Sequence, residues 1–232
     1  MAGESPQTPD KSTRRNFSRK GSTLAGSTPL TAFAVNCSLK SSKASEGSST
    51  DKLISDMLKA MEPYKVAGDV VRAADFDIRP GVSSDEGAGD EWPALRRRIL
   101  AADIFILGTP IWLGQPSSIA KRVLERMDAF LGETDAAGRM PPSGKVAVAA
   151  VVGNKDGAHH CHAAMFQALN DVGFTIPANA GAYWVGEAMG DVNYIDLKTM
   201  PETVKDTLNM LACNVCHLAR QLKSAPYPGL PA

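Results

Sequence analysis

The sequence of 232 residues lacks several features that would each assign it to a class of protein. No apolar run approaches the roughly 18 residues that a membrane-spanning helix needs. Neither sign of charge is in excess, because 25 Lys and Arg balance 25 Asp and Glu, whereas a dedicated nucleic-acid-binding protein normally carries a basic excess. The first 25 residues contain no signal-peptide apolar stretch, and four cysteines do not suggest a disulfide framework. The sequence therefore predicts a cytoplasmic protein with no membrane span and no nucleic-acid partner.

The composition of the first 28 residues differs from that of the rest. This segment holds five basic residues, two acidic residues and only three large apolar ones. Such a segment cannot bury enough apolar surface to offset the entropy lost on ordering. We expect residues 1–28 to form a disordered tail, residues 29–224 a single globular domain and residues 225–232 a C-terminal extension. A transit peptide or an anion-binding arm remains an alternative function for the tail.

From Leu30 onward, short apolar runs alternate with amphipathic segments. The apolar runs predict strands at residues 30–37, 66–72, 103–109, 145–152 and 174–177. Helical spacing of apolar residues predicts helices at residues 50–61, 93–101, from Pro116 to about 130, 159–171 and 201–223. Two of the strands, 103–109 and 145–152, are apolar without alternation, which is typical of central parallel strands covered on both faces. Five strands alternating with five helices predict an α/β fold with a doubly wound parallel sheet.

Three loops follow the carboxyl ends of predicted strands, where ligands of such sheets bind. The first, residues 37–50, contains six serines, a threonine and two lysines and leads into a helix N-terminus. Hydroxyl groups, free backbone N–H groups and a helix dipole together suit a phosphate, although a polar loop with an ordinary helix cap is the alternative. The loop matches neither Gly-x-Gly-x-x-Gly nor Gly-x-x-x-x-Gly-Lys-Ser/Thr. This argues against a dinucleotide-binding Rossmann domain and against a P-loop NTPase.

The second loop, residues 109–118, is apolar where a chain leaving a strand usually becomes polar. It carries Ile111, Trp112 and Leu113 in succession. An apolar and aromatic loop at a ligand-binding edge suits a flat conjugated ring, but packing of Trp112 against a neighbouring subunit would also explain it. The third loop, residues 153–160, contains two glycines that allow a close approach of backbone to ligand, or that simply form a turn.

Together these loops resemble the NADPH-dependent FMN reductases of the flavodoxin-like fold, over about residues 30–223. Ser38-Leu39-Lys40 followed by Gly47-Ser48-Ser49-Thr50 is similar to the phosphate loop of that family. Gly108-Thr109-Pro110-Ile111-Trp112 resembles its second signature, in which a strand runs into a Thr-Pro-aromatic loop over the flavin ring. The interval between Ser38 and Ser48 is longer than is usual in the family, and Lys40 stands where Arg is common.

The resemblance implies a five-stranded parallel sheet of order 2-1-3-4-5 that binds FMN noncovalently. The phosphate would be held by Ser38, Lys40, Ser48, Ser49 and Thr50. One side of the isoalloxazine would be bordered by Thr109, Pro110, Ile111, Trp112, Leu113 and Gly114. Its other edge would lie along Gly153, Asn154, Gly157 and His159.

The implied activity is that of an NAD(P)H-dependent oxidoreductase. Hydride would pass from NADPH or NADH to FMN, and electrons would pass on to a flavin, a quinone or a similar small-molecule acceptor. No catalytic side chain is assigned, because the flavin carries the redox chemistry. A homodimer is expected, because exposed aromatic side chains near the cleft are commonly buried against a second subunit. A flavodoxin-like electron carrier acting between protein partners, and a flavin-free domain that retains only the fold, remain alternatives.

Two clusters of His and Cys look like metal or haem sites, and neither is predicted to be one. Cys213-Asn214-Val215-Cys216-His217 matches the c-type haem attachment pattern. On the last predicted helix its two cysteines and its histidine are expected to face outward, opposite the apolar stripe, and haem attachment requires an exported chain. His159-His160-Cys161-His162 are immediate neighbours at a helix start, and such neighbours rarely converge on one ion.

Overall fold

The computed structural model describes residues 28–231, so nearly all of the predicted disordered tail lies outside the described residues. The parallel strands are β1 (Leu30–Asn36), β2 (Val66–Arg72), β3 (Ile104–Trp112), β5 (Val146–Gly153) and β6 (Gly181–Val185), and a two-residue strand, β4 (Gln115–Pro116), pairs antiparallel with β3. The helices are α1 (Ser49–Met61), α2 (Trp92–Ala101), α3 (Ser118–Met127), α4 (Ala158–Asp171) and α5 (Glu202–Ser224). Short 3-10 helices occur at Glu62–Tyr64, Ala73–Asp75, Asp128–Gly132 and Tyr194–Asp196.

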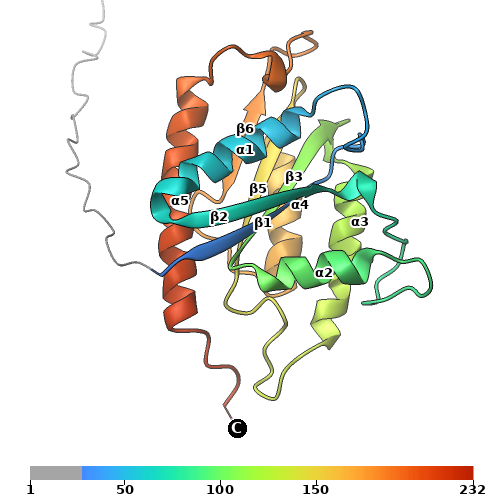
Figure 1. Ribbon diagram of the computed structural model, residues 1–232, viewed down its shortest axis with the longest axis vertical. Helices are drawn as coiled ribbons and strands as arrows, with labels where there is room; N and C mark the ends of the chain where they lie inside the picture. The colour runs from blue at the N-terminus through green and yellow to red at the C-terminus, as the bar shows by residue number, and fades with distance from the viewer. Residues whose placement is uncertain (1–27, 232) are drawn as a thin grey trace, which may run out of the picture.

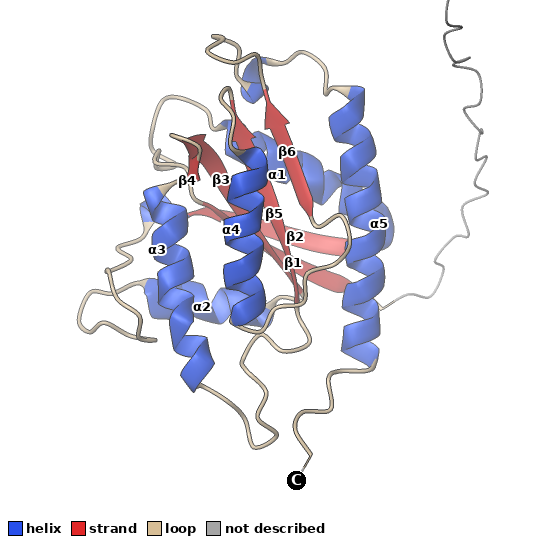
Figure 2. Cartoon of the chain, turned by 180° about the vertical axis from the view of Figure 1, so that it is seen from behind, coloured by secondary structure: helices blue, strands red, loops and turns tan. Residues whose placement is uncertain are grey.

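The strand order is β2-β1-β3-β5-β6, which confirms the predicted order 2-1-3-4-5 of the five parallel strands. Helices cover both faces of the sheet. Figure 1 shows α1 across the front, and Figure 2 shows α3 and α4 over the opposite face. One apolar core lies between the sheet and the pair α1 and α5, and a second lies between the sheet and α2, α3 and α4.

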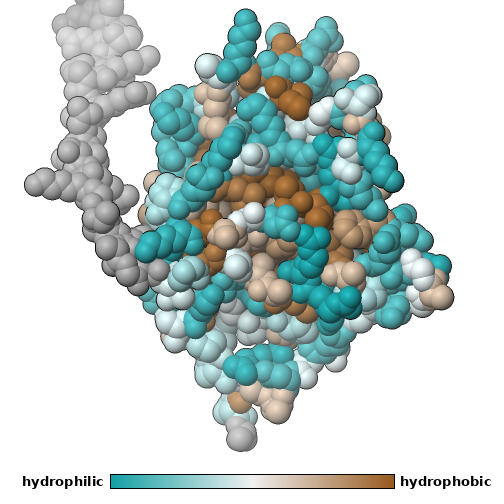
Figure 3. Space-filling view, in the orientation of Figure 1, coloured by the Kyte–Doolittle hydropathy of each residue, from teal (hydrophilic) through white to brown (hydrophobic). Residues whose placement is uncertain are grey.

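The two cores explain why the central strands are apolar at every position. On β3, Ile104 and Ile106 point into the core under α1 and α5, whereas Phe105 and Leu107 point into the other. Successive residues of a strand face opposite sides of a sheet, so a strand covered on both faces cannot alternate in polarity. The edge strand β2 differs, because part of it is exposed. Val70 of β2 is 41% exposed. Figure 3 shows apolar side chains gathered between α1 and α2.

The strand expected at residues 174–177 is wrong. Within that segment Thr175 makes a single bridge to Val146, and the last strand is β6 at Gly181–Val185. The apolar character of the segment serves the core instead, since the ring of Phe174 stacks on that of Phe105 with centroids 5.5 Å apart. The apolar residues of this segment therefore indicate burial and not pairing with a neighbouring strand.

Two expectations about helices also need correction. The helix expected to open at Pro116 begins at Ser118, because Pro116 pairs with Ile111 in the hairpin β3–β4 and Ser117 caps the helix. On α5, Cys216 was expected to face outward with its neighbours but is fully buried. Burial raises the pKa of the Cys216 thiol to about 12, which keeps it in the neutral form.

A buried ion pair holds the long loop between β2 and α2. Nη2 of Arg126 lies 2.7 Å from Oδ2 of Asp90, and both side chains are fully buried. The same guanidinium donates to the carbonyl oxygens of Arg79 at 2.9 Å and Ser83 at 3.1 Å. Desolvation acts to raise the pKa of Asp90, but the hydrogen bonds from Arg126 and from backbone N–H groups outweigh it and hold that pKa well below its usual range. The loop is thus anchored by charge as well as by packing.

None of the helices formed by residues 28–231 is long and apolar enough to cross a membrane.

Candidate functional site

A cavity of about 260 Å³ lies at the carboxyl edge of the sheet. Residues from five parts of the chain line it: 38–40, 47–50, 110–112, 152–154, and a last group made of 184 and 193–195. The first four groups lie at the carboxyl ends of β1, β3 and β5 or in the segments just after them, where the sequence predicted a ligand site. The fifth group lies at the end of β6 and in the segment after it, and it was not among the three loops selected from the sequence.

The polar end of the cavity is the N-terminus of α1. Ser48 caps the helix, and its hydroxyl accepts the N–H of Asp51 at 3.2 Å. The N–H groups of Ser49 and Thr50, in the first turn, have no acceptor within the helix. The helix can come this close to the sheet because Gly108 of β3 has no side chain, since a Cβ there would lie 2.9 Å from Cγ2 of Thr50. Free N–H groups and a positive helix end form a cradle for an anion.

Asn36, the last residue of β1, organises this cradle. Its side chain is fully buried. The amide nitrogen donates to the Ser48 hydroxyl at 3.1 Å and to the Asp51 carboxylate, and the amide oxygen accepts the N–H of Ser38 at 2.8 Å. One side chain therefore links both ends of the loop to the strand and to the helix.

The residues that lengthen the first loop are fastened to β2. Nε of Arg72 donates to Oδ2 of Asp51 at 2.7 Å, and Nη1 donates to the carbonyl oxygen of Ser41 at 2.6 Å. Asp75 accepts the N–H of Ser42 at 2.8 Å. The loop is thus shaped by contacts with the last residue of β2 and with the 3-10 helix that follows it.

Lys40 forms an ion pair with Glu46 within the same loop. Lys40 lines the cavity, so its charge is available to a ligand in competition with Glu46.

The apolar end of the cavity is a shelf formed by Pro110, Ile111 and Trp112, at the end of β3. Gly153 lies beside it, and a Cβ at that position would be 3.0 Å from Cβ of Ile111, a tight contact that would require Ile111 to shift slightly. Trp112 is 54% exposed, and Leu113, at the tip of the hairpin with a positive φ of 51°, is 90% exposed. The shelf is apolar and continues into exposed apolar side chains, a surface that suits a conjugated ring.

The N-terminus of α4 supports the back of that hairpin. Gly157 has a φ of 128°, and a Cβ there would lie 2.7 Å from Cα of Gly114. Nε2 of His160 is 2.9 Å from Oε1 of Gln115. The ring of His159 meets Tyr183 edge-on at 5.2 Å, outside the cavity lining. The contacts of Gly157 and His160 thus hold the hairpin that carries the shelf.

Most of the predicted site residues meet in this cavity. Those that line it are Ser38, Lys40, Ser48, Ser49, Thr50, Pro110, Ile111, Trp112, Gly153 and Asn154. The remaining predicted residues lie behind or beside it: Thr109, Leu113, Gly114, Gly157 and His159. Thr109 is buried, and its hydroxyl accepts the N–H of Ser117 at 2.9 Å, so it shapes the hairpin rather than facing a ligand.

Sequence reasoning missed the wall that follows β6. The lining residues not selected as site residues are Leu39, Gly47, Val152, Trp184, Asn193, Tyr194 and Ile195. Trp184, in β6, reaches the cavity. Asn193 and Asp196 form a capping box, the one local signal that could have marked an ordered turn here.

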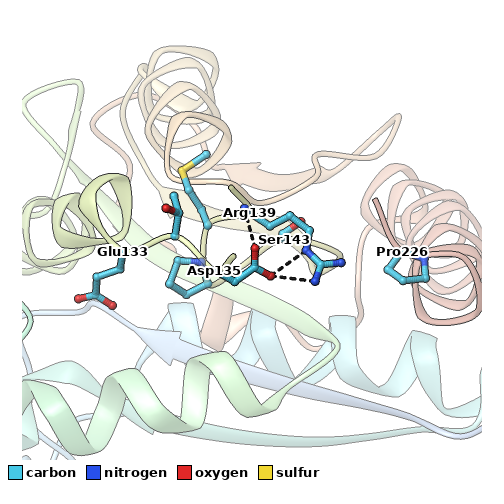
Figure 4. Close-up of a pocket in the computed structure, with 8 residues that line it drawn as sticks. Glu133, Asp135, Arg139, Ser143 and Pro226 are labelled. Carbon is cyan, nitrogen blue, oxygen red and sulfur yellow. Dashed lines mark hydrogen bonds and ion pairs between the residues drawn. The ribbon is translucent and has the colours of Figure 1, made fainter. Parts of the chain in front are cut away.

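A second hollow, of about 710 Å³, lies at the opposite end of the molecule between the loop 133–143 and Pro226 (Figure 4). It is larger than the cavity at the carboxyl edge. Its charged groups already have partners, because Arg139 pairs with Asp135 at 2.8 Å and Glu133 pairs with Arg96. The loop 133–143 precedes β5, so this hollow lies at the amino ends of the strands, away from the carboxyl edge where ligands of such sheets bind.

No three His, Cys, Asp or Glu side chains converge on a metal-binding geometry within the part of the chain that the structure describes. His162 is largely buried, and desolvation lowers its pKa to about 4, so its imidazole is neutral.

Comparison with known proteins assigns the family. The sequence profile of the NADPH-dependent FMN reductase family matches residues 31–190. The 8-demethyl-8-aminoriboflavin-5′-phosphate synthase of Streptomyces davaonensis is 35% identical over 211 residues, which cover 85% of this chain and 80% of that enzyme. The divalent metal cation transporter MntH of Mycobacterium bovis is 38% identical over 202 residues, 84% of this chain, but the chain spans only 29% of that transporter's length.

A solved structure agrees with this assignment. The crystal structure of RosB with the bound intermediate 8-demethyl-8-formylriboflavin-5′-phosphate has a TM-score of 0.76 and 32% identity, covering 85% of this chain and 82% of the other. The resemblance seen in the sequence is confirmed, and with it the flavodoxin-like fold, the oxidoreductase class and the family's cofactors, FMN and a reduced nicotinamide. The chain belongs to the NADPH-dependent FMN reductase family.

Proposed function

We propose that this protein is an NAD(P)H-dependent oxidoreductase that binds FMN in the cavity at the carboxyl edge of the sheet. The observation that supports it best is the pairing of two unlike surfaces in one cavity. An anion cradle at the start of α1 lies at one end, and the apolar shelf Pro110–Trp112 lies at the other. A flavin phosphate is a ligand with an anionic end and a flat conjugated end.

The residues present fit this ligand. Ser49 and Thr50 would donate N–H groups to the phosphate, and Lys40 would supply a positive charge. Lys40 is a point charge rather than a fork, so it would attract the phosphate without the bidentate geometry of an arginine. Trp112 and Ile111 would exclude water from one side of the ring. When bound, FMN supplies the redox chemistry, by accepting hydride from a reduced nicotinamide and passing electrons to an acceptor.

The test is an absorbance spectrum of the purified protein, recorded again after anaerobic addition of NADPH and then of NADH. We expect an oxidised-flavin spectrum that bleaches with a reduced nicotinamide. Flavin that stays oxidised with both donors, yet is reduced by dithionite, would favour the electron carrier. A protein that neither carries flavin nor retains added FMN after desalting would contradict the proposal.

A second function is supported by the relatives at 32–35% identity, one a synthase of a modified flavin phosphate and one solved with such an intermediate bound. In this case the flavin phosphate would itself be the substrate. Mass spectrometry of flavin recovered after aerobic incubation distinguishes the two functions. Unchanged FMN supports the reductase, and a change in flavin mass supports flavin modification.

A small-molecule acceptor and a homodimer are part of the same proposal. Exposure of Trp112 and Leu113 beside the cavity supports an apolar acceptor or a covering subunit. Light scattering at micromolar concentration tests the dimer, and a monomeric mass would exclude it under those conditions. The cytoplasmic location stays a prediction, for which fractionation of the native host is the test.

A further inference from the structure

The segment between β6 and α5 crosses the phosphate end of the cavity. We call residues 187–197 the strap. At one end Asn154 holds it, because the Asn154 side-chain amide donates to the carbonyl oxygen of Gly190 at 2.8 Å and the Asn154 carbonyl accepts the N–H of Met189 at 3.2 Å. At the other end the short helix Tyr194–Asp196 lies against the first turns of α1.

A buried polar contact fastens that second end. The Tyr194 hydroxyl donates to Oδ2 of Asp56 at 2.9 Å, and Tyr194 is fully buried. Nζ of Lys52 lies 3.3 Å from the same carboxylate oxygen and 4.8 Å from the centroid of the Tyr194 ring. Desolvation, reinforced by Asp56, raises the pKa of Tyr194, so the phenol remains a donor. A hydrogen bond to a carboxylate shielded from water is among the stronger kinds in proteins.

The fastened strap acts on the anion cradle through one backbone group. The N–H of Ile195, next to Tyr194, donates to Oγ of Ser49 at 3.2 Å. A serine hydroxyl that accepts one hydrogen bond keeps its own proton for another acceptor. Ser49 and Ile195 both line the cavity, and Gly47 leaves the space that the Ile195 side chain occupies.

We propose that Tyr194 is a positioning residue for the flavin phosphate. Its bond to Asp56 holds the Ile195 N–H on Ser49, and Ser49 then donates its hydroxyl proton to a phosphate oxygen. This rests on the proposed function, since it requires that a flavin 5′-phosphate occupies the cavity. The consequence is that the strap strengthens binding of FMN and contributes little to binding of riboflavin, which has no phosphate.

The experiment measures dissociation constants of FMN and riboflavin by flavin-fluorescence titration of the full chain. We expect Tyr194→Phe to weaken FMN binding about tenfold, equivalent to about 1.4 kcal/mol, and riboflavin binding less than about twofold. The matched control is Tyr227→Phe, which loses a 3.0 Å hydrogen bond to Thr175 away from the cavity. This control should change neither constant.

A double-mutant cycle tests the route through Ser49. If Ser49 transmits the effect, Tyr194→Phe weakens FMN binding far less in a Ser49→Ala background. Should Tyr194→Phe fail to fold by circular dichroism, Asp56→Asn replaces it, because the amide oxygen is a weaker acceptor and should give a smaller loss in the same direction. Equal loss of FMN and riboflavin binding, or additive effects of Tyr194 and Ser49, would overturn the inference. Failure of the wild type to bind FMN would overturn the proposed function as well.

Discussion

Asn36 is the residue whose removal should most directly disorder the anion cradle. Asn36→Ala deletes two donated hydrogen bonds, one of them to the Asp51 carboxylate, and leaves the buried N–H of Ser38 without its acceptor. Leaving a buried donor unsatisfied costs about 1–3 kcal/mol, and a net hydrogen bond contributes about 1 kcal/mol. With partial relaxation of the loop, we expect the free energy of unfolding to fall by about 2–4 kcal/mol.

The same change should weaken FMN binding by about tenfold to a hundredfold, because the first-turn N–H groups of α1 would no longer be held in place. Urea unfolding of the flavin-free protein gives the first quantity, and fluorescence titration gives the second. Asn36→Asp keeps the shape but faces the Asp51 carboxylate with a like charge, so its effects should be at least as large. The control Asn170→Ala loses a 3.3 Å bond to the Phe174 carbonyl, outside the cavity lining, and should leave FMN affinity unchanged. Wild-type FMN affinity in Asn36→Ala would refute the role given to this side chain.

Three further changes have expected outcomes. Glu46→Gln releases its lysine partner and should tighten FMN binding about twofold to threefold at low salt, an effect that titration in high salt should abolish. Arg126→Met leaves Asp90 buried without its ion partner and should lower the free energy of unfolding by about 3–5 kcal/mol in urea. Since the pKa of Asp90 is depressed in the fold, the wild type should lose that contribution as pH falls below the ordinary carboxyl range near 4, and Asp90→Asn should flatten this pH dependence. Gly157→Ala should destabilise by about 2–4 kcal/mol and weaken FMN binding, whereas Gly87→Ala, at a φ of 90° with no neighbour within 4 Å, should show only the smaller cost of backbone strain.

The central part of the fold was predictable because its signals are local. Residues 103–109 and 145–152 are largely apolar runs of strand length, and both form central strands that are buried on both faces of the sheet. The same pattern wrongly predicted a strand at residues 174–177, where Phe174 is buried because its ring stacks on that of Phe105. A one-dimensional pattern reports burial, and it does not say whether the buried backbone pairs with a neighbour.

The candidate site, like the fold, has a part with local sequence signals and a part without them. The cradle and the shelf follow directly from loops next to strong strands, so the sequence indicated them. The strap was missed because its apolar residues, Tyr194 and Ile195 among them, are interspersed with polar ones in a segment too short to set a helical or strand period. Tyr194 meets its partner Asp56 across 138 positions of the chain, and no spacing rule reports a contact of that kind.

The continuity of β3 has a consequence for how this family member can change over evolutionary time. One strand runs from the middle of the sheet to the shelf, with no hinge between Leu107 and Trp112, so the orientation of the shelf is inherited from the core. Leu113, at the tip of the hairpin, lies beyond that strand and is 90% exposed. If FMN binds as proposed, substitutions at the tip would alter which acceptors enter without tilting the surface proposed to hold the flavin ring. Substitutions along β3 would change the core packing and the orientation of the shelf together. New specificity should therefore arise at the tip while the shelf is retained.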